Sequence, residues 1–317
     1  MRHSLALAIA AATLLTAVDA KEVLPESGPV SINTMQRLLI VDAASVGTRV
    51  VAVGDRGWIA LSDDRGASWK RAKSPAAPLL TAVDFIDDKR GWAVGHDAMI
   101  LATADGGETW TKQFSGPLDQ GPLLDVHFVD AKRGFAVGAY GTFYETSDGG
   151  AKWAARKVVV DDKHLNAIVD AGKGNLIVLG EAGTILRSGD AGATWQPVAS
   201  PYKGSFFGGT TTRDGAVLAF GLRGRIYRST DGGKTWTQVA NASEASLMSA
   251  SVLADGAIAL TGAAGTLLVS RDNGETFTPL ASGRRGVISK ALAGAPGVIL
   301  LLGESGVHEL RAGGEAK

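Results

Sequence analysis

Six aspartates recur along this chain at nearly constant spacing, and their carboxylates are the first candidates for chemistry. They stand at Asp64, Asp105, Asp148, Asp190, Asp231 and Asp272, so successive copies are 41, 43, 42, 41 and 41 residues apart. Each belongs to the pattern Ser/Thr-x-Asp-x-Gly-x-x-aromatic, whose last residue is Trp69, Trp110, Trp153, Trp195, Trp236 or Phe277. A carboxylate in a glycine-rich loop is able to bind a cation. It is also able to accept hydrogen bonds from backbone N–H groups just ahead of it and so close a turn.

We interpret this repeated element, called the acidic turn below, as a structural hairpin turn. Every copy carries the aspartate, and none adds a second acidic ligand in a consistent place. The glycine two residues later supplies a backbone conformation closed to bulkier residues. The aromatic residue then begins a strand and offers a large apolar surface to a neighbouring sheet. We therefore expect no metal ion and no cofactor.

Other catalytic signals are weak. The four histidines beyond residue 20 fall in different repeats, at His96, His127, His164 and His308. Asp125 and His127 lie two apart on one expected strand, a spacing that suits proton transfer, but we favour a hydrogen-bonded channel lining. The chain has no cysteine, which excludes disulfides, thiolate metal sites and cysteine nucleophiles. We predict that the protein is not an enzyme.

A second repeated unit positions the acidic turns. Short β-rich runs flank a Gly-x-x-Gly turn, as in Val51–Leu61, and this unit occurs seven times. Four short antiparallel strands in about 40 residues are typical of a propeller blade. Seven such repeats occupy nearly all of the chain after residue 20. We predict an all-β, seven-bladed propeller over residues 21–311, followed by a flexible tail at residues 312–317.

The last repeat is incomplete. It stops near Leu310, before an acidic turn forms, so its blade lacks a fourth strand. An open blade exposes a sheet edge, which propellers avoid. We predict that an N-terminal strand within Val23–Ile32 closes the last blade.

Residues 1–20 have the features of a cleavable signal peptide. A short basic start precedes the apolar run Leu5–Val18, and small residues precede Lys21. The run is shorter than a membrane-spanning helix requires. We therefore predict export, to the periplasm in a diderm bacterium, with no cysteine available for lipid attachment. The chain carries 32 basic and 32 acidic residues, a balance that does not favour nucleic acid as a partner.

The best candidates for binding are residues that differ between repeats on the face formed by the Gly-x-x-Gly turns and the links between blades. Arginine and tyrosine are common anchors of protein interfaces. The most suggestive group comes from the links and turns of repeats five to seven: Tyr202, Lys203, Arg223, Arg225, Arg284 and Arg285. A scatter of solvated charges is the alternative. We expect a monomer that binds another protein at this basic patch.

The acidic turns resemble the Asp-box, or bacterial neuraminidase repeat, of sialidases and other propellers. The longer frame Arg90–Gly95, Ile100–Thr103 and Asp105–Trp110 resembles the photosystem II assembly/stability factor family of seven-bladed propellers. The resemblance spans about residues 35–310. It implies a non-catalytic assembly factor that binds a membrane protein or membrane-protein complex through an arginine-rich surface. In a non-photosynthetic host it implies a possible link to an exporter of the resistance-nodulation-division type.

A glycan-binding or sialidase-like propeller is the alternative function. Sialidases resemble this chain in the acidic turns alone. They also need an Arg-Ile-Pro sequence near the start, three arginines that grip a carboxylate, a Tyr/Glu nucleophile pair and an acidic Asp. The chain has no Arg-Ile-Pro, and the expected inner strands contain no arginine.

Overall fold

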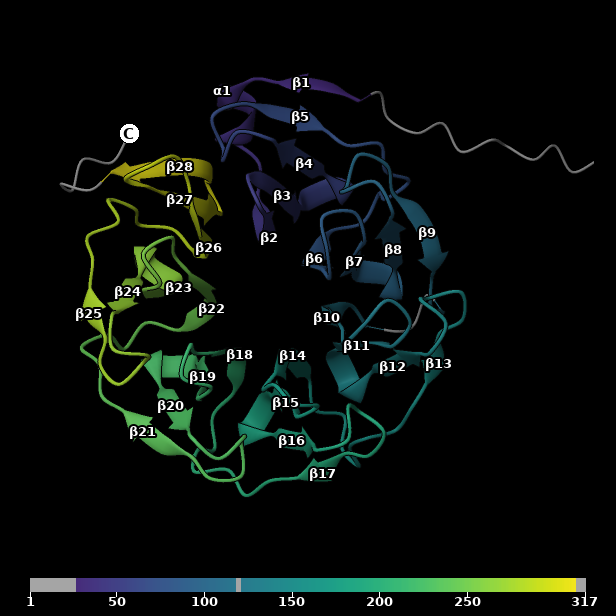
Figure 1. The fold of residues 1–317 in the computed structure, drawn as a ribbon, viewed down its shortest axis with the longest axis vertical. Helices are drawn as coiled ribbons and strands as arrows, with labels where there is room; N and C mark the ends of the chain where they lie inside the picture. Colours follow the sequence, from purple (N-terminus) through teal and green to yellow (C-terminus); the bar gives the residue numbers. More distant parts are fainter. Residues whose placement is uncertain (1–26, 118–120, 312–317) are drawn as a thin grey trace, which may run out of the picture.

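Seven β-sheets stand in a ring around a central channel in the computed structural model, which describes residues 27–117 and 121–311 (Figure 1). The prediction of a seven-bladed propeller is confirmed. Residues 1–20 and 312–317, for which we predict a signal peptide and a tail, lie outside the described residues.

Each blade is an antiparallel meander that runs outward from the channel. The innermost strands are β2 (Ile40–Val46), β6 (Leu80–Phe85), β10 (Leu123–Phe128), β14 (Leu165–Asp170), β18 (Phe206–Thr211), β22 (Leu247–Val252) and β26 (Ile288–Ala293). The second strands are β3 (Arg49–Gly54), β7 (Gly91–Gly95), β11 (Gly134–Gly138), β15 (Leu176–Gly180), β19 (Val217–Gly221), β23 (Ile258–Gly262) and β27 (Val298–Gly303). The third strands are β4 (Ile59–Ser62), β8 (Ile100–Thr103), β12 (Phe143–Thr146), β16 (Ile185–Ser188), β20 (Ile226–Ser229), β24 (Leu267–Ser270) and β28 (Gly306–Arg311). The fourth strands, present in six blades, are β5 (Trp69–Arg71), β9 (Thr111–Phe114), β13 (Ala154–Ala155), β17 (Gln196–Pro197), β21 (Thr237–Val239) and β25 (Thr278–Pro279).

The second strands form the core because both of their faces are covered by neighbouring blades. All five residues of β7 and of β15 are buried. Their continuous apolar sequences fit strands covered on both faces. The glycine that ends each second strand is required by a close approach: a Cβ on Gly95 would lie 2.1 Å from the carbonyl oxygen of Leu79. This approach lets the first residue of the inner strand pair with that glycine, as Leu80 does with Gly95.

A 3₁₀ turn joins the second and third strands in six blades. These turns are η1 (Asp55–Gly57), η2 (His96–Ala98), η3 (Ala139–Gly141), η4 (Glu181–Gly183), η5 (Leu222–Gly224) and η6 (Ala263–Gly265). The middle residue of each has a left-handed backbone, with φ between 51° and 59°. Arg56 and Tyr140 hold this position in η1 and η3, and both side chains are exposed. The 3₁₀ turns and the acidic turns lie at opposite ends of the third strands, so they occupy opposite faces of the ring.

The acidic turns are closed by their own side chains. Ser62 Oγ donates to Asp64 Oδ1 over 2.8 Å and accepts from the N–H of Gly66 over 2.6 Å. The N–H of Ser68 donates to the same carboxylate over 2.8 Å. Equivalent bonds hold the other five copies. Within the described residues, no group of three or more acidic or histidine side chains is placed to hold a metal ion.

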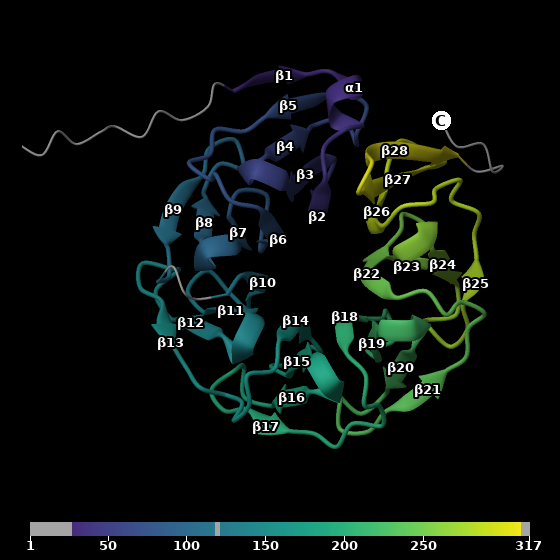
Figure 2. The same ribbon diagram turned by 180° about the vertical axis from the view of Figure 1, so that it is seen from behind.

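The prediction that an N-terminal strand closes the last blade is wrong. The first described strand, β1 (Gly28–Val30), pairs with β5 (Figure 2), so within residues 27–117 and 121–311 blade 1 has five strands and blade 7 has three. The cause is the short helix α1 (Ile32–Met35), whose N-terminus is capped by Ser31 Oγ, which accepts from the N–H of Thr34 over 3.1 Å. This helix turns the chain between β1 and β2 and thereby leaves β1 on the outside of blade 1.

Blade 7 is instead joined to blade 1 by side chains. Met35 is fully buried in one cluster with Leu302 and Val307 of blade 7. Ser289 Oγ on β26 donates to the carbonyl oxygen of Ile40 on β2 over 2.7 Å. The ring therefore closes by packing and by side-chain hydrogen bonds.

In the part of the chain that the structure describes, no helix has the length and apolar character needed to cross a membrane.

Candidate functional site

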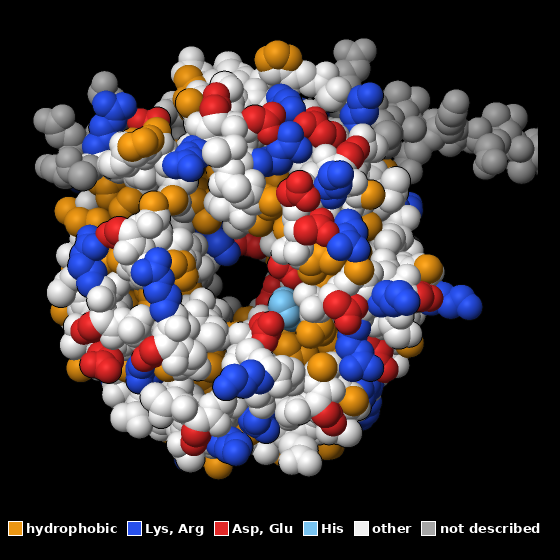
Figure 3. All heavy atoms as spheres, in the orientation of Figure 1, with side chains coloured by type: hydrophobic (Ala, Val, Ile, Leu, Met, Phe, Trp, Pro, Cys, Tyr) orange, Lys and Arg blue, Asp and Glu red, His pale blue; other side chains and the backbone are white. Residues whose placement is uncertain are grey.

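The inner strands enclose a cavity of about 700 Å³ in the channel. Its wall includes Asp42, Asp125, Asn166 and Lys290. Acidic side chains gather along the wall of the hole on the side of β6 and β10 (Figure 3).

Three carboxylates on the inner strands β2, β6 and β10 connect successive blades. Asp42 Oδ2 accepts from the N–H of Val83 over 3.0 Å, which joins blade 1 to blade 2. Asp84 Oδ2 accepts from the N–H of Phe128 over 3.0 Å, and Asp125 Oδ2 accepts from the N–H of Ile168 over 2.7 Å. Because each carboxylate already holds a backbone N–H of the next blade, it is a fixed part of the wall.

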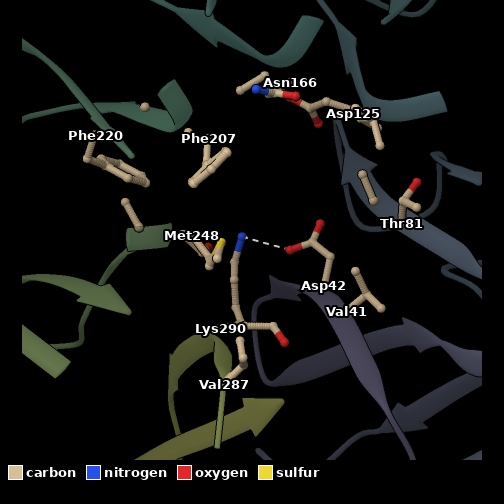
Figure 4. Close-up of a pocket in the computed structure, with 18 of the residues that line it drawn as sticks. Val41, Asp42, Thr81, Asp125, Asn166, Phe207, Phe220, Met248, Val287 and Lys290 are labelled. Atoms are coloured by element: carbon tan, nitrogen blue, oxygen red, sulfur yellow. Dashed lines mark ion pairs between the residues drawn. The ribbon is translucent and has the colours of Figure 1, made fainter. Parts of the chain in front are cut away.

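Lys290 supplies the positive charge among these carboxylates. Its Nζ lies 2.9 Å from Asp42 Oδ1, and the two side chains are 21% and 19% exposed. Burial alone lowers the pKa of an ammonium group, but the charges of Asp42, Asp125 and Asp84 together raise the pKa of Lys290. Lys290 is therefore charged and held toward Asp42, as Figure 4 shows.

Asp125 lines the channel cavity, as predicted, and the ion pair of His127 is with Asp84 instead of Asp125. His127 Nδ1 lies 3.3 Å from Asp84 Oδ2, on the neighbouring blade. Burial lowers the pKa of His127, but the hydrogen bond and charge of Asp84 outweigh it and raise the pKa. Burial, together with the charges of Asp42 and Asp84, raises the pKa of Asp125 to about 7. The geometry joins the histidine to Asp84 and leaves Asp125 bonded to the backbone.

The opposite wall of the cavity is apolar. Phe207, Phe220 and Met248, from blades 5 and 6, lie across from Asp42 (Figure 4). The cavity therefore has an acidic side and an aromatic side, with Lys290 between them. Such a surface suits binding of an amphipathic group.

The predicted basic patch is divided by the structure into two groups. The first is centred on Tyr202, whose hydroxyl donates to the carbonyl oxygen of Leu222 over 3.0 Å. The Tyr202 ring also packs on Phe206 and Tyr227, with centroids 5.6 and 5.7 Å away. Tyr202 is thus half-buried and partly structural. Lys203, Arg223 and Arg225, its neighbours in the link and in and beside η5, are exposed.

The second group lies in the link between blades 6 and 7. Arg285 is exposed, whereas Arg284 is half-buried. Burial lowers the pKa of His308, and the charge of Arg284 adds to this effect. Turn η6, with two alanines and a glycine, stands between the two groups along the ring. The six predicted residues therefore come from the links that precede blades 5 and 7 and from in and beside η5.

Sequence reasoning missed Asp42, Asp84 and Lys290. A signal for two of them was present. When the inner strands are aligned on the residue that pairs with the glycine of the second strand, Asp42, Asp125 and Lys290 occupy the same position. Alignment of the seven inner strands would therefore have revealed one ring position that carries charge in blades 1, 3 and 7.

A family model described as photosynthesis system II assembly factor YCF48 matches residues 61–120 and 112–251, which is more than half of the chain. The chain belongs to the YCF48 family. A curated relative, the chloroplastic photosystem II stability/assembly factor HCF136 of Cyanidioschyzon merolae, is 46% identical over 48 residues. That match covers 14% of this chain and 11% of the relative, so the chain aligns with about a tenth of the relative's length.

Two solved structures show how widely the fold is shared. A structure described as YCF48 bound to D1 peptide has a TM-score of 0.68 at 20% identity and covers 89% of this chain and 93% of its own. The GH74 xyloglucanase of Xanthomonas campestris also has a TM-score of 0.68, at 16% identity, and covers 90% of this chain and 53% of its own. At these identities the likeness establishes the fold alone, so membership of the YCF48 family rests on the sequence match.

Proposed function

We propose that this chain is an exported, non-catalytic assembly factor that binds a segment of a membrane protein or membrane-protein complex. The observation that carries the proposal is the match of the YCF48 family model to residues 61–251. A family member with the same fold has been solved with a peptide named as D1. We place the contact on the face formed by the 3₁₀ turns and the links.

This face presents the groups that protein interfaces use. Tyr140 is 64% exposed at the centre of η3, and Arg223 is exposed at the centre of η5. Lys203, Arg225 and Arg285 add exposed positive charge. Arginine and tyrosine are enriched at interfaces because they combine a large apolar body with a polar end. In a photosynthetic host the partner is a photosystem II subunit; in another host we propose a membrane transporter.

Capture of partners from membranes tests the proposal. The immobilised protein should retain specific membrane proteins, and the double variant Arg223→Glu, Arg225→Glu should retain less of them. Arg285→Glu tests the second basic group without disturbing the half-buried Arg284. The matched control is Lys152→Glu with Lys234→Glu, two exposed positions in acidic turns on the opposite face. Equal capture by the wild type and both sets of variants would remove the basic groups from the proposal.

Export is a separate part of the proposal and needs its own test. We propose that residues 1–20 are removed and that residues 21–311 form the mature propeller. Mass spectrometry of the protein from its native host should find an N-terminus at Lys21 in the periplasmic fraction. An intact Met1 on protein from the cytosol would contradict it.

A glycan-binding or glycoside-hydrolysing propeller has less support. The xyloglucanase shares the fold, but Asp42, Asp84 and Asp125 of this chain are each bonded to a backbone N–H of the next blade. We expect no release of product from sialosides or xyloglucan. If the wild type hydrolyses either glycan and Asp125→Asn does not, a glycoside hydrolase becomes the better-supported function.

A further inference from the structure

Seven interfaces join neighbouring blades of the ring. In six of them, the aromatic residue that ends an acidic turn packs in one cluster with residues of the preceding blade. Trp110 of blade 2 is 1% exposed and packs in one cluster with Val51 and Leu61 of blade 1. Phe277 of blade 6 packs with Leu218 and Phe220 of blade 5. The other clusters contain Trp69, Trp153, Trp195 and Trp236 in the same arrangement. The interface between blades 6 and 7 is the exception among the described residues.

A cavity of about 350 Å³ lies at this interface. Its apolar wall is formed by Leu253, Val269, Leu280, Ala293, Ile299 and Leu310. We call it the blade 7 groove. Leu280 is 40% exposed and lines this groove. The groove is thus an apolar space that opens to solvent.

The strand register places a small residue, Ala293, at this groove. Ala293 pairs with Ile299 in the way that Phe85 pairs with Gly91 in blade 2, so Ala293 occupies the position of Phe85. In blade 2 the ring of Phe85 contacts Trp110 edge-on, with centroids 6.1 Å apart. Blade 7 therefore lacks this ring as well as the aromatic residue of an acidic turn.

The end of the sequence has the form of a degraded acidic turn. Leu310 pairs with Ile299 as Thr103 pairs with Gly91, so residues 310–317 correspond to residues 103–110. The two sequences are Leu-Arg-Ala-Gly-Gly-Glu-Ala-Lys and Thr-Ala-Asp-Gly-Gly-Glu-Thr-Trp. Ala312 replaces the aspartate and Lys317 replaces the tryptophan. Residues 1–26, 118–120 and 312–317 contain no Phe, Trp or Tyr.

The edge beside the groove is also open in the described structure. β28 is the outermost strand of the three-stranded blade 7, whereas each of the other blades has a fourth strand. An edge strand presents backbone N–H and C=O groups that pair readily with another extended chain. In the other blades, one short segment supplies both the aromatic residue of the acidic turn and the fourth strand. The blade 7 groove and the edge of β28 lack both in the described structure.

We propose that an extended segment of a partner protein pairs with β28 and inserts an aromatic side chain into the blade 7 groove. This proposal rests on the proposed protein-binding function and names its mode of binding. Arg65, Arg271 and Arg311 lie at the groove, where Asp255 pairs with Arg271 and Glu309 with Arg311. Three arginines against two carboxylates favour a segment that is acidic or neutral beside its aromatic residue.

A peptide from a complete blade is a direct probe. Residues 229–239, Ser-Thr-Asp-Gly-Gly-Lys-Thr-Trp-Thr-Gln-Val, contain the acidic turn and outer strand of blade 5. We expect this dye-labelled peptide to bind the purified chain saturably by fluorescence anisotropy. The same peptide with Trp236→Ala should bind at least about tenfold more weakly, because burial of the ring provides much of the affinity. Absence of binding, or equal binding of the two peptides, would overturn the proposal.

Variants of the protein locate the binding. Ala293→Phe restores the ring found at Phe85 and fills the groove, so it should weaken binding of the Trp peptide at least about tenfold without lowering the melting temperature. Val252→Phe is the matched control, because Val252 holds the same position in blade 6, where Phe277 already occupies the interface. Leu280→Glu, at the open rim, is a second variant in case Ala293→Phe folds poorly. Unchanged binding in both Ala293→Phe and Leu280→Glu would place the peptide elsewhere and refute the assignment.

The outcomes separate this proposal from the function on which it rests. If wild type and Ala293→Phe capture the same membrane proteins, the groove is not the binding mode, although the assembly function stands. If the wild type captures none while the peptide binds in the groove, the assembly function fails and the groove remains an aromatic site. Concentration-dependent dimers in sedimentation that disappear in Ala293→Phe would assign the groove to a second copy of this chain, against the proposal.

Discussion

Lys290 and Asp42 connect the last blade of the ring to the first, with 2.9 Å between Nζ and Oδ1. The contact stands beside the hydrogen bond from Ser289 to Ile40, at the point where the chain closes on itself. No other blade supplies an amine at this ring position, because the six equivalent residues are Asp42, Ala82, Asp125, Ala167, Gly208 and Ser249. The closure of the propeller thus includes an ion pair inside an acidic channel.

Lys290→Met should destabilise the protein by about 3 kcal/mol, because it leaves the Asp42 carboxylate half-buried without its cation. Urea unfolding followed by circular dichroism measures the loss. Lys112→Met, at an exposed position on β9, is the control and should change stability little. The double variant Lys290→Met, Asp42→Asn should recover part of the loss. An unchanged midpoint in Lys290→Met would show that the pair does not hold the ring closed.

The raised pKa of Asp125 predicts a pH dependence of stability. Its pKa is about 7 in the folded protein and about 3.9 in an unfolded chain, so the folded state binds this proton more tightly. The stabilisation is fully present below about pH 4 and is lost as the pH rises through about 7. Asp125→Asn removes this titration, so relative to the variant the wild type should lose about 2 kcal/mol in the free energy of unfolding between pH 5 and pH 7, and less than about 0.5 kcal/mol between pH 7 and pH 8.

Unfolding in urea at pH 5, 7 and 8 checks this relation. The test is whether the free energy of unfolding of Asp125→Asn minus that of the wild type changes with pH. A part of this difference that is the same at every pH reflects altered hydrogen bonds to Ile168 and Val126. A difference that stays flat over this range would mean that Asp125 ionises well below neutral pH.

The acidic turn should contribute stability without a metal. Asp231 accepts from the N–H and the hydroxyl of Thr235, over 3.0 and 2.6 Å, and from Ser229 Oγ over 2.8 Å. Asp231→Ala leaves these donors without their acceptor and should cost about 1–2 kcal/mol in the free energy of unfolding. Asp97→Ala, at the exposed centre of η2, is the control. A chelator should leave the melting temperature of the wild type unchanged, and a shift on adding calcium would show that the turns bind ions.

The N-terminal segment should act through Met35 more than through β1. Met35 is fully buried against Leu302 and Val307, so Met35→Ala should cost about 2–4 kcal/mol. Ile32→Ala, in the same helix and 47% exposed, should cost much less. Deletion of residues 1–30 removes β1, the outermost described strand of blade 1, and should lower stability less than Met35→Ala. The reverse order, measured by thermal unfolding, would mean that strand pairing by β1 holds the ring together.

The regular parts of this fold could be predicted because each repeat contains the same turn-forming sequence motifs. Asp64 with Ser62 and Gly66 closes one turn, and the Gly-x-x-Gly unit closes another, so the number of blades follows from counting them. The path of Gly28–Val30 was not predictable in this way, because an edge of blade 1 and an edge of blade 7 both accept a strand. The choice depends on α1 and on the burial of Met35, which is a tertiary effect.

The candidate site was less predictable for a similar reason. Arg223 and Arg284 were assigned to one surface by their position in equivalent segments, yet the side chain of Arg284 is half-buried and η6 separates it from η5. The contact of His127 with Asp84 crosses between blades, so the spacing of Asp125 and His127 within one strand pointed to the wrong partner. Sequence spacing locates residues on a blade, whereas contacts between blades depend on the twist and register of both sheets.

The bond between Ser289 and Ile40 spans 249 residues of sequence, whereas the bond from Thr81 to Leu123 spans 42. Neighbouring blades are therefore able to associate one after another as the polypeptide is made. The contact between blade 7 and blade 1 is able to form only after residue 289 and its strand have been synthesised. Contacts of such long range slow the last step of folding. The time during which the unfinished ring is open to proteases is thus determined by its C-terminal repeat.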